Sequence, residues 1–413
     1  MDILIKPSIL KGKVDIPASK SVAHRMLICA ALADGQSAVS GLKYCSNDID
    51  ATIDAMSQLG AEFLVGQHNS STQCVFGIQN IPEKAIIDCN ESGSTLRFII
   101  PIACALGVET EFHGRGRLPQ RPIDIYIREL TKHGITFDYN KTMPFTVSGR
   151  LTSSIYEIEG NVSSQFITGL LFALPLVEGD SEIILTSHLE SRPYVDITID
   201  ILKRFGIVIE ETENSFKIKG GQKYTPHDEC VEGDYSQAAF FHVANALGSN
   251  IRTGNLNPDS VQGDKKITDI IKSATKDGKI TGFRADCSDI PDLVPILSVL
   301  GAYGSEKSVI YNAERLRIKE SDRLAACADM INNLGGNVTV TPDGLEIQPT
   351  GHLHGGTIDS YGDHRIVMAA AVAALCCDGD VIIKGAEAVN KSYPNFFDDY
   401  KNLGGKADVI NLE

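Results

Sequence analysis

Six apolar stretches of helical length along the chain are each preceded by a short polar cluster. The clusters read PASKS (17–21), NESGS (90–94), VSSQ (162–165), GDYSQ (233–237), DIPDL (289–293) and YGDHR (361–365). Measured between Lys20, Gly93, Ser164, Tyr235, Pro291 and Asp363, the steps are 73, 71, 71, 56 and 72 residues. Self-similarity at a nearly constant period indicates internal duplication, with a shortened fourth unit. The pattern predicts six repeated units, each with a helix that begins at its polar cluster.

A second series of positions, all glycines, follows the same rhythm. The glycines are Gly60, Gly134, Gly206, Gly278, Gly335 and Gly404, with steps of 74, 72, 72, 57 and 69 residues. Glycine is favoured just after a helix, because it adopts the left-handed conformation without a Cβ penalty. Such glycines are common in any protein, but the two series share one short interval. We predict that each unit ends an amphipathic helix at one of these glycines and then enters a strand.

The apolar stretches differ in how their hydrophobic residues are distributed. Residues 21–35, 94–107 and 163–179 are apolar nearly all round, which predicts buried helices. Residues 48–60 and 196–206 are amphipathic and should form an outer layer. Alternating β-branched residues predict strands within 71–79, 181–187, 338–349 and 380–385. The units therefore combine helices with short strands, as in an α/β protein.

Length and charge narrow the choice of architecture and partner. With 413 residues, the chain is too long for one hydrophobic core and should form two domains of about 200 residues each. The six units divide naturally as three plus three. A net charge of −15 argues against nucleic acid as the main partner. A small anion can still bind, because lysines and arginines in a cleft act locally.

The cysteines and the first residues indicate the compartment. The ten cysteines include no C-x-x-C pair, so we expect reduced, mostly buried thiols rather than disulfides or a zinc site. The sequence MDILIKPSILKG lacks the apolar core of a signal peptide, and no apolar run is long enough to span a membrane. We expect a cytoplasmic monomer with no metal, no cofactor and no membrane or nucleic-acid partner.

The polar clusters at the predicted helix starts suit the binding of anions. A helix start exposes unpaired N–H groups and the positive end of the helix dipole. Lys20 and Arg365 add formal positive charge to two of the clusters. Each feature also has a simpler interpretation, since serines commonly cap helices and Arg323 could pair with Glu320 three residues earlier. Six such starts in one repeat favour a single site for a substrate with several negative charges.

Ten short motifs occur in the order that one enzyme family shows. They are PASKSVAHR, NESGSTLR, QRPI, NVSSQFITGLL, SRPYVDIT, QGD, IPDL, RIKESDRL, YGDHR and NKSYPNFF. Through these motifs the chain resembles the 3-phosphoshikimate 1-carboxyvinyltransferases (EPSP synthases) of the enolpyruvyl transferase family over residues 17–400. The resemblance implies an α/β fold, a two-domain inside-out α/β barrel of six repeated units with three per domain.

The resemblance also implies domain boundaries and substrates. One domain, residues 1–16 plus 233–413, would bind phosphoenolpyruvate and carry the acid/base groups. The other, residues 17–232, would bind shikimate 3-phosphate, with the active site in the interdomain cleft. Members of the family add the enolpyruvyl group of phosphoenolpyruvate to the 5-hydroxyl of shikimate 3-phosphate in chorismate biosynthesis, and the herbicide glyphosate targets them.

The family's binding residues match positions of this chain one by one. Both substrates carry phosphate and carboxylate groups, which require several cations and hydrogen-bond donors. For phosphoenolpyruvate the resemblance implies Lys20, Gly93, Arg121, Gln165, Arg323, Arg365 and Lys391. For shikimate 3-phosphate it implies Lys20, Ser21, Arg25, Ser163, Ser164, Gln165, Ser191, Tyr194, Asp292 and Lys319.

Asp292 and Glu320 match the acid/base groups of the family. The reaction needs a proton removed from the attacking hydroxyl and a proton placed on C3 of phosphoenolpyruvate. We expect Asp292 to take the hydroxyl proton and Glu320 to act at C3, together with Lys20 or Lys391. The alternative for Asp292 is a helix cap without a catalytic role. On the catalytic hypothesis, Asp292→Asn should preserve folding and binding but cost on the order of 10²-fold or more in turnover.

Two other functions compete with this hypothesis. The sister enolpyruvyl transferase acting on UDP-N-acetylglucosamine has the same fold, but it carries a cysteine in the loop before the Arg-Pro pair. Residues 107–122 contain no cysteine here. A non-catalytic or RNA-processing protein is the second alternative, since RNA 3′-phosphate cyclases use a related repeat. The acidic net charge opposes that alternative.

Overall fold

The computed structural model describes residues 1–43, 45–66 and 69–410, which divide into two compact units. Unit 1 combines Met1–Pro17 with Gly233–Glu413, and unit 2 is Ala18–Glu232. The chain therefore starts in unit 1, builds unit 2 and returns, and each unit has its own hydrophobic core. No helix in the described residues is both long enough and apolar enough to cross a membrane.

All six polar clusters begin helices, as their spacing predicted. The helices are α1 (Lys20–Leu32), α3 (Gly93–Leu106), α5 (Ser164–Ala173), α7 (Tyr235–Ala246), α9 (Val294–Ala302), which follows the 3-10 turn η4 (Pro291–Leu293), and α11 (His364–Ala373). Four of these starts are capped by a side chain that accepts a first-turn N–H, namely Ser92, Ser163, Asp234 and Asp363. The polar clusters thus satisfy backbone groups that the helix itself leaves unpaired.

Five of the six glycines end helices, and the sixth corrects the prediction. The five helices are α2 (Asn47–Gln58), α4 (Asp124–Thr131), α6 (Arg192–Arg204), α10 (Arg323–Asn333) and α12 (Phe396–Asn402), and the glycine after each has a positive φ. Gly278 also has a positive φ, but it lies in the turn between β16 (Thr275–Lys276) and β17 (Lys279–Ile280). Because the fourth unit is shorter, α8 (Ile267–Ser273) ends before this turn.

Unit 2 contains three four-stranded sheets with one strand order. The sheets are β14-β3-β5-β4, β6-β7-β9-β8 and β10-β11-β13-β12. Their strands are β3 (Gln36–Ser40), β4 (Glu62–Gly66), β5 (Asn69–Phe76), β6 (Lys84–Asp88), β7 (Glu109–His113), β8 (Thr136–Asp138), β9 (Phe145–Ser148), β10 (Ile155–Ile158), β11 (Ser181–Leu185), β12 (Ile209–Glu211), β13 (Ser215–Ile218) and β14 (Glu229–Cys230). In each sheet the first pair is parallel and the other pairs are antiparallel.

Unit 1 repeats this order in β18-β19-β21-β20 and β22-β23-β1-β24. Its strands are β1 (Asp2–Lys6), β2 (Lys11–Asp15), β15 (Asn250–Gly254), β18 (Arg284–Asp286), β19 (Ser308–Tyr311), β20 (Asn337–Val340), β21 (Leu345–Gln348), β22 (Gly356–Asp359), β23 (Val381–Lys384) and β24 (Lys406–Ile410). Strand β1 occupies the third place of its sheet, so the first residues of the chain complete the last repeat. In the part of the chain that the structure describes, the shortened repeat contributes the pair β15-β2 and the hairpin β16-β17.

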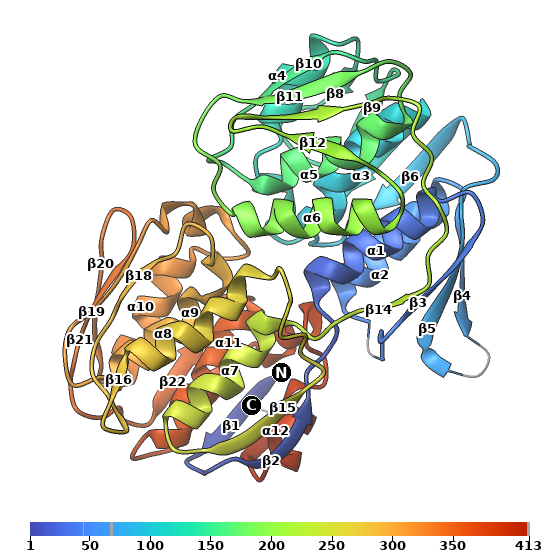
Figure 1. The fold of residues 1–413 in the computed structure, drawn as a ribbon. Coiled ribbons are helices and arrows are strands. Elements are labelled where there is room, and N and C mark those ends of the chain that lie inside the picture. The colour runs from blue at the N-terminus through green and yellow to red at the C-terminus, as the bar shows by residue number, and fades with distance from the viewer. Residues whose placement is uncertain (44, 67–68, 411–413) are drawn as a thin grey trace. The chain divides into compact units, whose positions relative to one another are not determined.

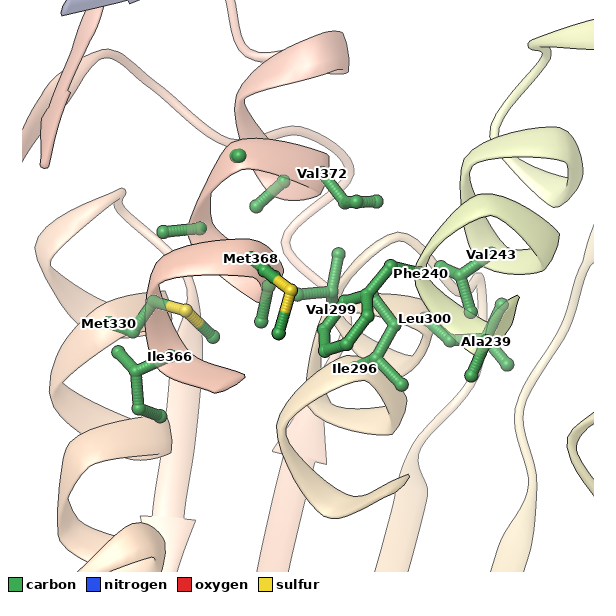
Figure 2. Close-up of a cluster of buried hydrophobic side chains, with 14 of the residues drawn as sticks. Ala239, Phe240, Val243, Ile296, Val299, Leu300, Met330, Ile366, Met368 and Val372 are labelled. Carbon is green, nitrogen blue, oxygen red and sulfur yellow. The ribbon is translucent and has the colours of Figure 1, made fainter. Parts of the chain in front are cut away.

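In each unit some helices lie inside, and the sheets lie outside them (Figure 1). The helices that are apolar all round are central, since every residue of α9 and of α11 is buried. Figure 2 shows α7, α9 and α11 contributing Phe240, Leu300 and Met368 to one apolar cluster. This arrangement is the inverse of a sheet with helices on its faces, and it gathers the N-termini of the central helices within each unit.

Candidate active site

In unit 1, Arg323 is enclosed by three carboxylates. Its guanidinium lies 2.8 Å from Asp292 Oδ1, 2.7 Å from Glu320 Oε2 and 2.8 Å from Asp363 Oδ2. The Arg323 side chain is 1% exposed. The partners come from η4, from the segment before α10 and from the N-cap of α11. The simpler interpretation, a pairing of Arg323 with Glu320, is therefore confirmed, but this ion pair is one of three that Arg323 forms.

Arg365 extends this group to a further helix start. Its Nη2 donates to Asp292 Oδ2 at 2.7 Å and to Ser236 Oγ, in the first turn of α7, at 3.1 Å. Its backbone N–H donates to Asp363 Oδ1 at 3.0 Å, which caps α11. We call Asp292, Glu320, Arg323, Asp363 and Arg365 the carboxylate–arginine cluster. It ties together the N-termini of α7, η4, α10 and α11.

The cluster fixes the charge of Asp292. Burial alone raises the pKa of this carboxyl, but Arg365 and Arg323 lower it by more, so the pKa of Asp292 lies well below its usual range. For Lys319, which directly follows η5 (Glu314–Ile318), the effect of burial on the pKa is larger than that of the neighbouring charges. Burial lowers the pKa of its ammonium to about 8, although Asp292 and Glu320 favour the charged form. Unit 1 therefore combines a firmly ionised carboxylate with a lysine whose pKa is lowered to about 8.

Lys391 lies beside the same helix start. It ends η7 (Ala386–Lys391), and its Nζ donates to the backbone carbonyl of Gly362 at 2.9 Å. Gly362 directly precedes Asp363, the cap of α11. Five of the predicted site residues are thus associated in unit 1 through Arg323, Arg365 and this loop.

In unit 2, Arg25 is buried among neutral groups. It is 3% exposed and donates to Thr198 Oγ1 at 2.8 Å, to the Ser21 carbonyl at 2.6 Å and to the Tyr194 carbonyl at 2.9 Å. Its guanidinium lies 5.2 Å from the centre of the Phe98 ring. Burial lowers the pKa of Arg25 to about 10. Among the described residues no carboxylate pairs with Arg25, so its hydrogen-bond partners are a hydroxyl and two backbone carbonyls.

Gly93 and Arg121 form a second contact in unit 2. A Cβ built on Gly93 would lie 2.5 Å from Arg121 Nη1 and 2.6 Å from its Cζ. Such distances are shorter than any ordinary contact, so the guanidinium rests directly on the glycine backbone. Gly93 begins α3 and Arg121 follows the 3-10 turn η1 (Leu118–Gln120). The glycine thus places an arginine at a helix N-terminus.

Gln165 connects the first turns of two helices, and one of its partners, Arg97, was not predicted from the sequence. Its Nε2 donates to Ser94 Oγ at 2.9 Å, and its Oε1 accepts from Arg97 Nη1 at 2.7 Å. Arg97 also lies over the Phe166 ring, 5.0 Å from its centre. These contacts hold the amide of Gln165 between the first turns of α3 and α5.

The remaining predicted residues of unit 2 occupy ordinary structural positions. Lys20 begins α1, and its Nζ lies 2.7 Å from Asp48 Oδ2 on α2. Ser163 caps α5, which confirms the simpler interpretation of that serine, and Ser164 is the first helical residue. Ser191 precedes α6 with a left-handed φ of 56°. These serines lie at helix starts, where N–H groups as well as hydroxyls can meet a phosphate.

Sequence reasoning missed several partners of the site. Asp363 and Arg97 lie inside the motifs YGDHR and NESGSTLR, and Ser236 lies inside the GDYSQ cluster. Asp363 is the N-cap of α11, Ser236 is the second residue of α7 and Arg97 is the fifth residue of α3, so a polar residue at or near each predicted helix start was the available signal. Asp48, the partner of Lys20, belongs to no motif.

Comparisons with known proteins agree along the whole chain. The family model "EPSP synthase (3-phosphoshikimate 1-carboxyvinyltransferase)" matches residues 4–400. A 3-phosphoshikimate 1-carboxyvinyltransferase of Clostridium novyi (strain NT) is 47% identical, over 100% of this chain and 99% of the relative. One from Clostridioides difficile (strain 630) is 42% identical over 99% and 98%. The solved EPSP synthase of Acinetobacter baumannii matches with a TM-score of 0.82 and 24% identity over 99% of this chain and 100% of that one.

Proposed function

The chain belongs to the EPSP synthase (3-phosphoshikimate 1-carboxyvinyltransferase) family, and on that premise we propose how its residues carry out enolpyruvyl transfer. The substrates are phosphoenolpyruvate and shikimate 3-phosphate, and the products are 5-enolpyruvylshikimate 3-phosphate and phosphate. Family membership decides for this acceptor over a UDP-sugar. The observation that supports the residue assignments best is the carboxylate–arginine cluster, which holds the proposed base, Asp292, against two proposed phosphoenolpyruvate ligands.

Shikimate 3-phosphate is assigned mainly to unit 2. Arg25 would bind the shikimate carboxylate, because a buried guanidinium with neutral partners gains most from an added anion. The 3-phosphate would lie at the N-termini of α5 and α6, where Ser163, Ser164 and Ser191 stand. Further contacts are assigned to Lys20, Ser21, Gln165, Tyr194, Asp292 and Lys319.

Phosphoenolpyruvate is assigned to residues of both units. Arg121, Lys20, Gln165 and the N-terminus of α3 at Gly93 would contribute from unit 2. Arg323, Arg365 and Lys391 would contribute from unit 1. The cations outnumber the charges of this substrate, which matches the need to neutralise both a phosphate and a carboxylate.

The chemistry follows from a competition for the arginines. When phosphoenolpyruvate anions engage Arg323 and Arg365, those arginines hold the Asp292 carboxylate less strongly, so the pKa of Asp292 rises and it becomes a better base. Asp292 would then take the proton of the 5-hydroxyl as its oxygen bonds to C2 of phosphoenolpyruvate. C3 would receive a proton from Glu320 or Lys20. The group that gave this proton would then take a proton back from C3, as the bond between C2 and the phosphate oxygen breaks and phosphate leaves with its electron pair.

An assay of phosphate release tests the function directly. With phosphoenolpyruvate alone we expect no release above background, and with added shikimate 3-phosphate we expect sustained turnover. UDP-N-acetylglucosamine serves as the matched acceptor control. Turnover with the UDP-sugar alone, or binding of RNA at physiological salt without phosphate release, would contradict the proposal. We further propose that the protein acts as a cytoplasmic monomer, which sedimentation and cell fractionation would test.

Gly93→Ala is expected to raise KM for phosphoenolpyruvate by roughly 10–100-fold, the cost of misplacing a charged hydrogen-bond partner. The new methyl would collide with the Arg121 guanidinium, since the Cβ position lies 2.5 Å from Nη1. KM for shikimate 3-phosphate should change much less, because Arg25 and the serine-bearing helix starts are untouched. Steady-state kinetics with each substrate varied in turn measure both values. Equal increases in the two constants would speak against a specific role of this contact.

The rate should fall above about pH 8, because the pKa of the Lys319 ammonium is lowered to about 8 in the folded protein. Below that pH the lysine is charged and can bind the substrate phosphate, which is a dianion above about pH 6. As pH rises through 8 the cation is lost, so kcat/KM for shikimate 3-phosphate declines. Lys319→Arg keeps its charge and should remove this alkaline limb. A limb that persists in the arginine variant would assign the titration to another group.

A further inference from the structure

Three potential metal ligands gather on the surface of unit 1, outside the residues assigned above. His352 and His354 lie between β21 and β22, and Asp378 follows the 3-10 turn η6 (Ala374–Cys376). His354 Nδ1 is 2.7 Å from Asp378 Oδ2, and the two imidazole rings are 4.6 Å apart between centres. One ligand atom from each residue lies within 4.8 Å of the other two. The side chains of His354 and Asp378 are 52% and 56% exposed.

The backbone holds the two segments in register. The Asp378 N–H donates to the Leu353 carbonyl at 3.1 Å, and the His354 N–H donates to the Leu334 carbonyl at 2.7 Å. Leu353 is completely buried, so the residue between the two histidines anchors the segment in the core. The imidazoles and the carboxylate therefore project from fixed backbone positions, although their side chains are solvent-accessible.

Gly335 makes room for one of the rings. A Cβ on this glycine would lie 2.5 Å from His354 Cδ2, so the imidazole packs directly on the backbone at the end of α10. This contact restricts the His354 ring more than exposure alone would suggest. A ligand whose ring is held in place loses less side-chain entropy when it binds an ion.

The local electrostatics favour a cation. Leu334, whose carbonyl accepts from His354, is the C-cap of α10. Asp378 lies two residues beyond the end of η6, which continues α11. The negative ends of these helices therefore lie next to the histidines and the aspartate. The carboxylate–arginine cluster lies at the other ends of these two helices, at the N-termini of α10 and α11.

We propose that His352, His354 and Asp378 form a binding site for a divalent transition-metal ion of the zinc class. Imidazole and carboxylate are ligands that such ions prefer. Around tetrahedral zinc, ligand atoms lie about 3.4 Å apart, given bond lengths of about 2.0–2.1 Å. His354 Nδ1 and Asp378 Oδ2, now 2.7 Å apart, would separate slightly, and His352 would complete the ligand set by rotation about its χ angles. The ion would cross-link the segment before β22 to the turn after η6 and so stabilise unit 1.

Titration calorimetry of the EDTA-treated full-length protein with zinc chloride tests this site. We expect one equivalent to bind, and His352→Asn, His354→Asn and Asp378→Asn each to weaken binding by roughly tenfold or more. Zinc at about 100 times the dissociation constant of the native protein should raise its melting temperature by roughly 5–10 °C, and the same zinc concentration should raise that of each variant by about half as much or less. Phosphate release should stay unchanged in all three, since none is assigned to a substrate.

Two matched variants serve as controls. His227→Asn removes another partly exposed histidine with a carboxylate partner, Glu229 at 3.0 Å, but without a second histidine. Cys376→Ser removes an exposed thiol close in sequence, whose sulfur contacts the Leu247 carbonyl at 3.4 Å. Both should bind zinc as the native protein does. Loss of binding in Cys376→Ser, or full binding in Asp378→Asn, would overturn the proposed ligand set.

Discussion

Arg323→Met is expected to lower the free energy of unfolding of unit 1 by about 3–5 kcal/mol, the usual cost of leaving a buried charge without its partner. The substitution keeps an unbranched side chain of similar length but removes the cation shared by Asp292, Glu320 and Asp363. Asp363 is completely buried, so its charge has no access to water as compensation. Native-state hydrogen exchange of the α10 and α11 amides measures this loss within unit 1.

Arg25→Met is the matched control for this effect. Arg25 is as buried as Arg323, but its partners are a hydroxyl and two backbone carbonyls. Removing it strands no charge, and replacing a buried charge by an apolar side chain is often neutral or stabilising. We therefore expect unit 2 to keep its stability while KM for shikimate 3-phosphate rises. Equal losses of stability in the two variants would show that burial, rather than the carboxylate partners, sets the cost.

The local parts of the fold were predictable from the sequence because local rules determine them. A polar residue that caps a helix and a glycine that ends one act within a single turn, so the start of α3 and the end of α10 follow from motif and spacing alone. Gly278 shows where this reasoning fails. A positive φ suits a hairpin turn as well as a helix end, and only the pairing of β16 with β17 distinguishes them.

The site was predictable as a set of residues but not as a set of contacts. The motifs identified Arg25 and Lys20, yet their partners Thr198 and Asp48 lie 173 and 28 residues away. No periodicity relates such positions, because tertiary packing brings them together. Gly93 was predicted as a residue of the phosphoenolpyruvate site, but its contact with Arg121, whose Nη1 would lie 2.5 Å from a Cβ at this position, was not.

The proposed zinc site also depends on tertiary contacts that could not be predicted from the sequence. The ten cysteines include no C-x-x-C pair, and the expectation of no metal rested on cysteine spacing alone. The pair His352 and His354 is too short a pattern to predict a site, because two histidines need a third ligand. Asp378 becomes that ligand only through the backbone pairing of its segment with Leu353.

Asp292→Asn is expected to lower kcat by on the order of 10²-fold or more, because the amide cannot accept the proton of the 5-hydroxyl. The structure adds a cost that the motif did not predict. The carboxylate accepts from both Arg323 at 2.8 Å and Arg365 at 2.7 Å, and asparagine offers only one acceptor oxygen for the two. Steady-state kinetics give kcat and KM, and hydrogen exchange gives the stability of the same preparation.

The two measurements separate catalysis from positioning. If Asp292 is the base, kcat falls in every preparation that remains folded. KM for phosphoenolpyruvate stays the same or falls, because the Asp292 carboxylate no longer competes with the substrate anions for the arginines. If Asp292 only positions the arginines, KM rises and kcat at saturating substrate recovers. Wild-type kcat at saturation would therefore remove Asp292 from the proton transfer and leave Glu320 and Lys20 as the candidates, because each also lies beside a group of opposite charge.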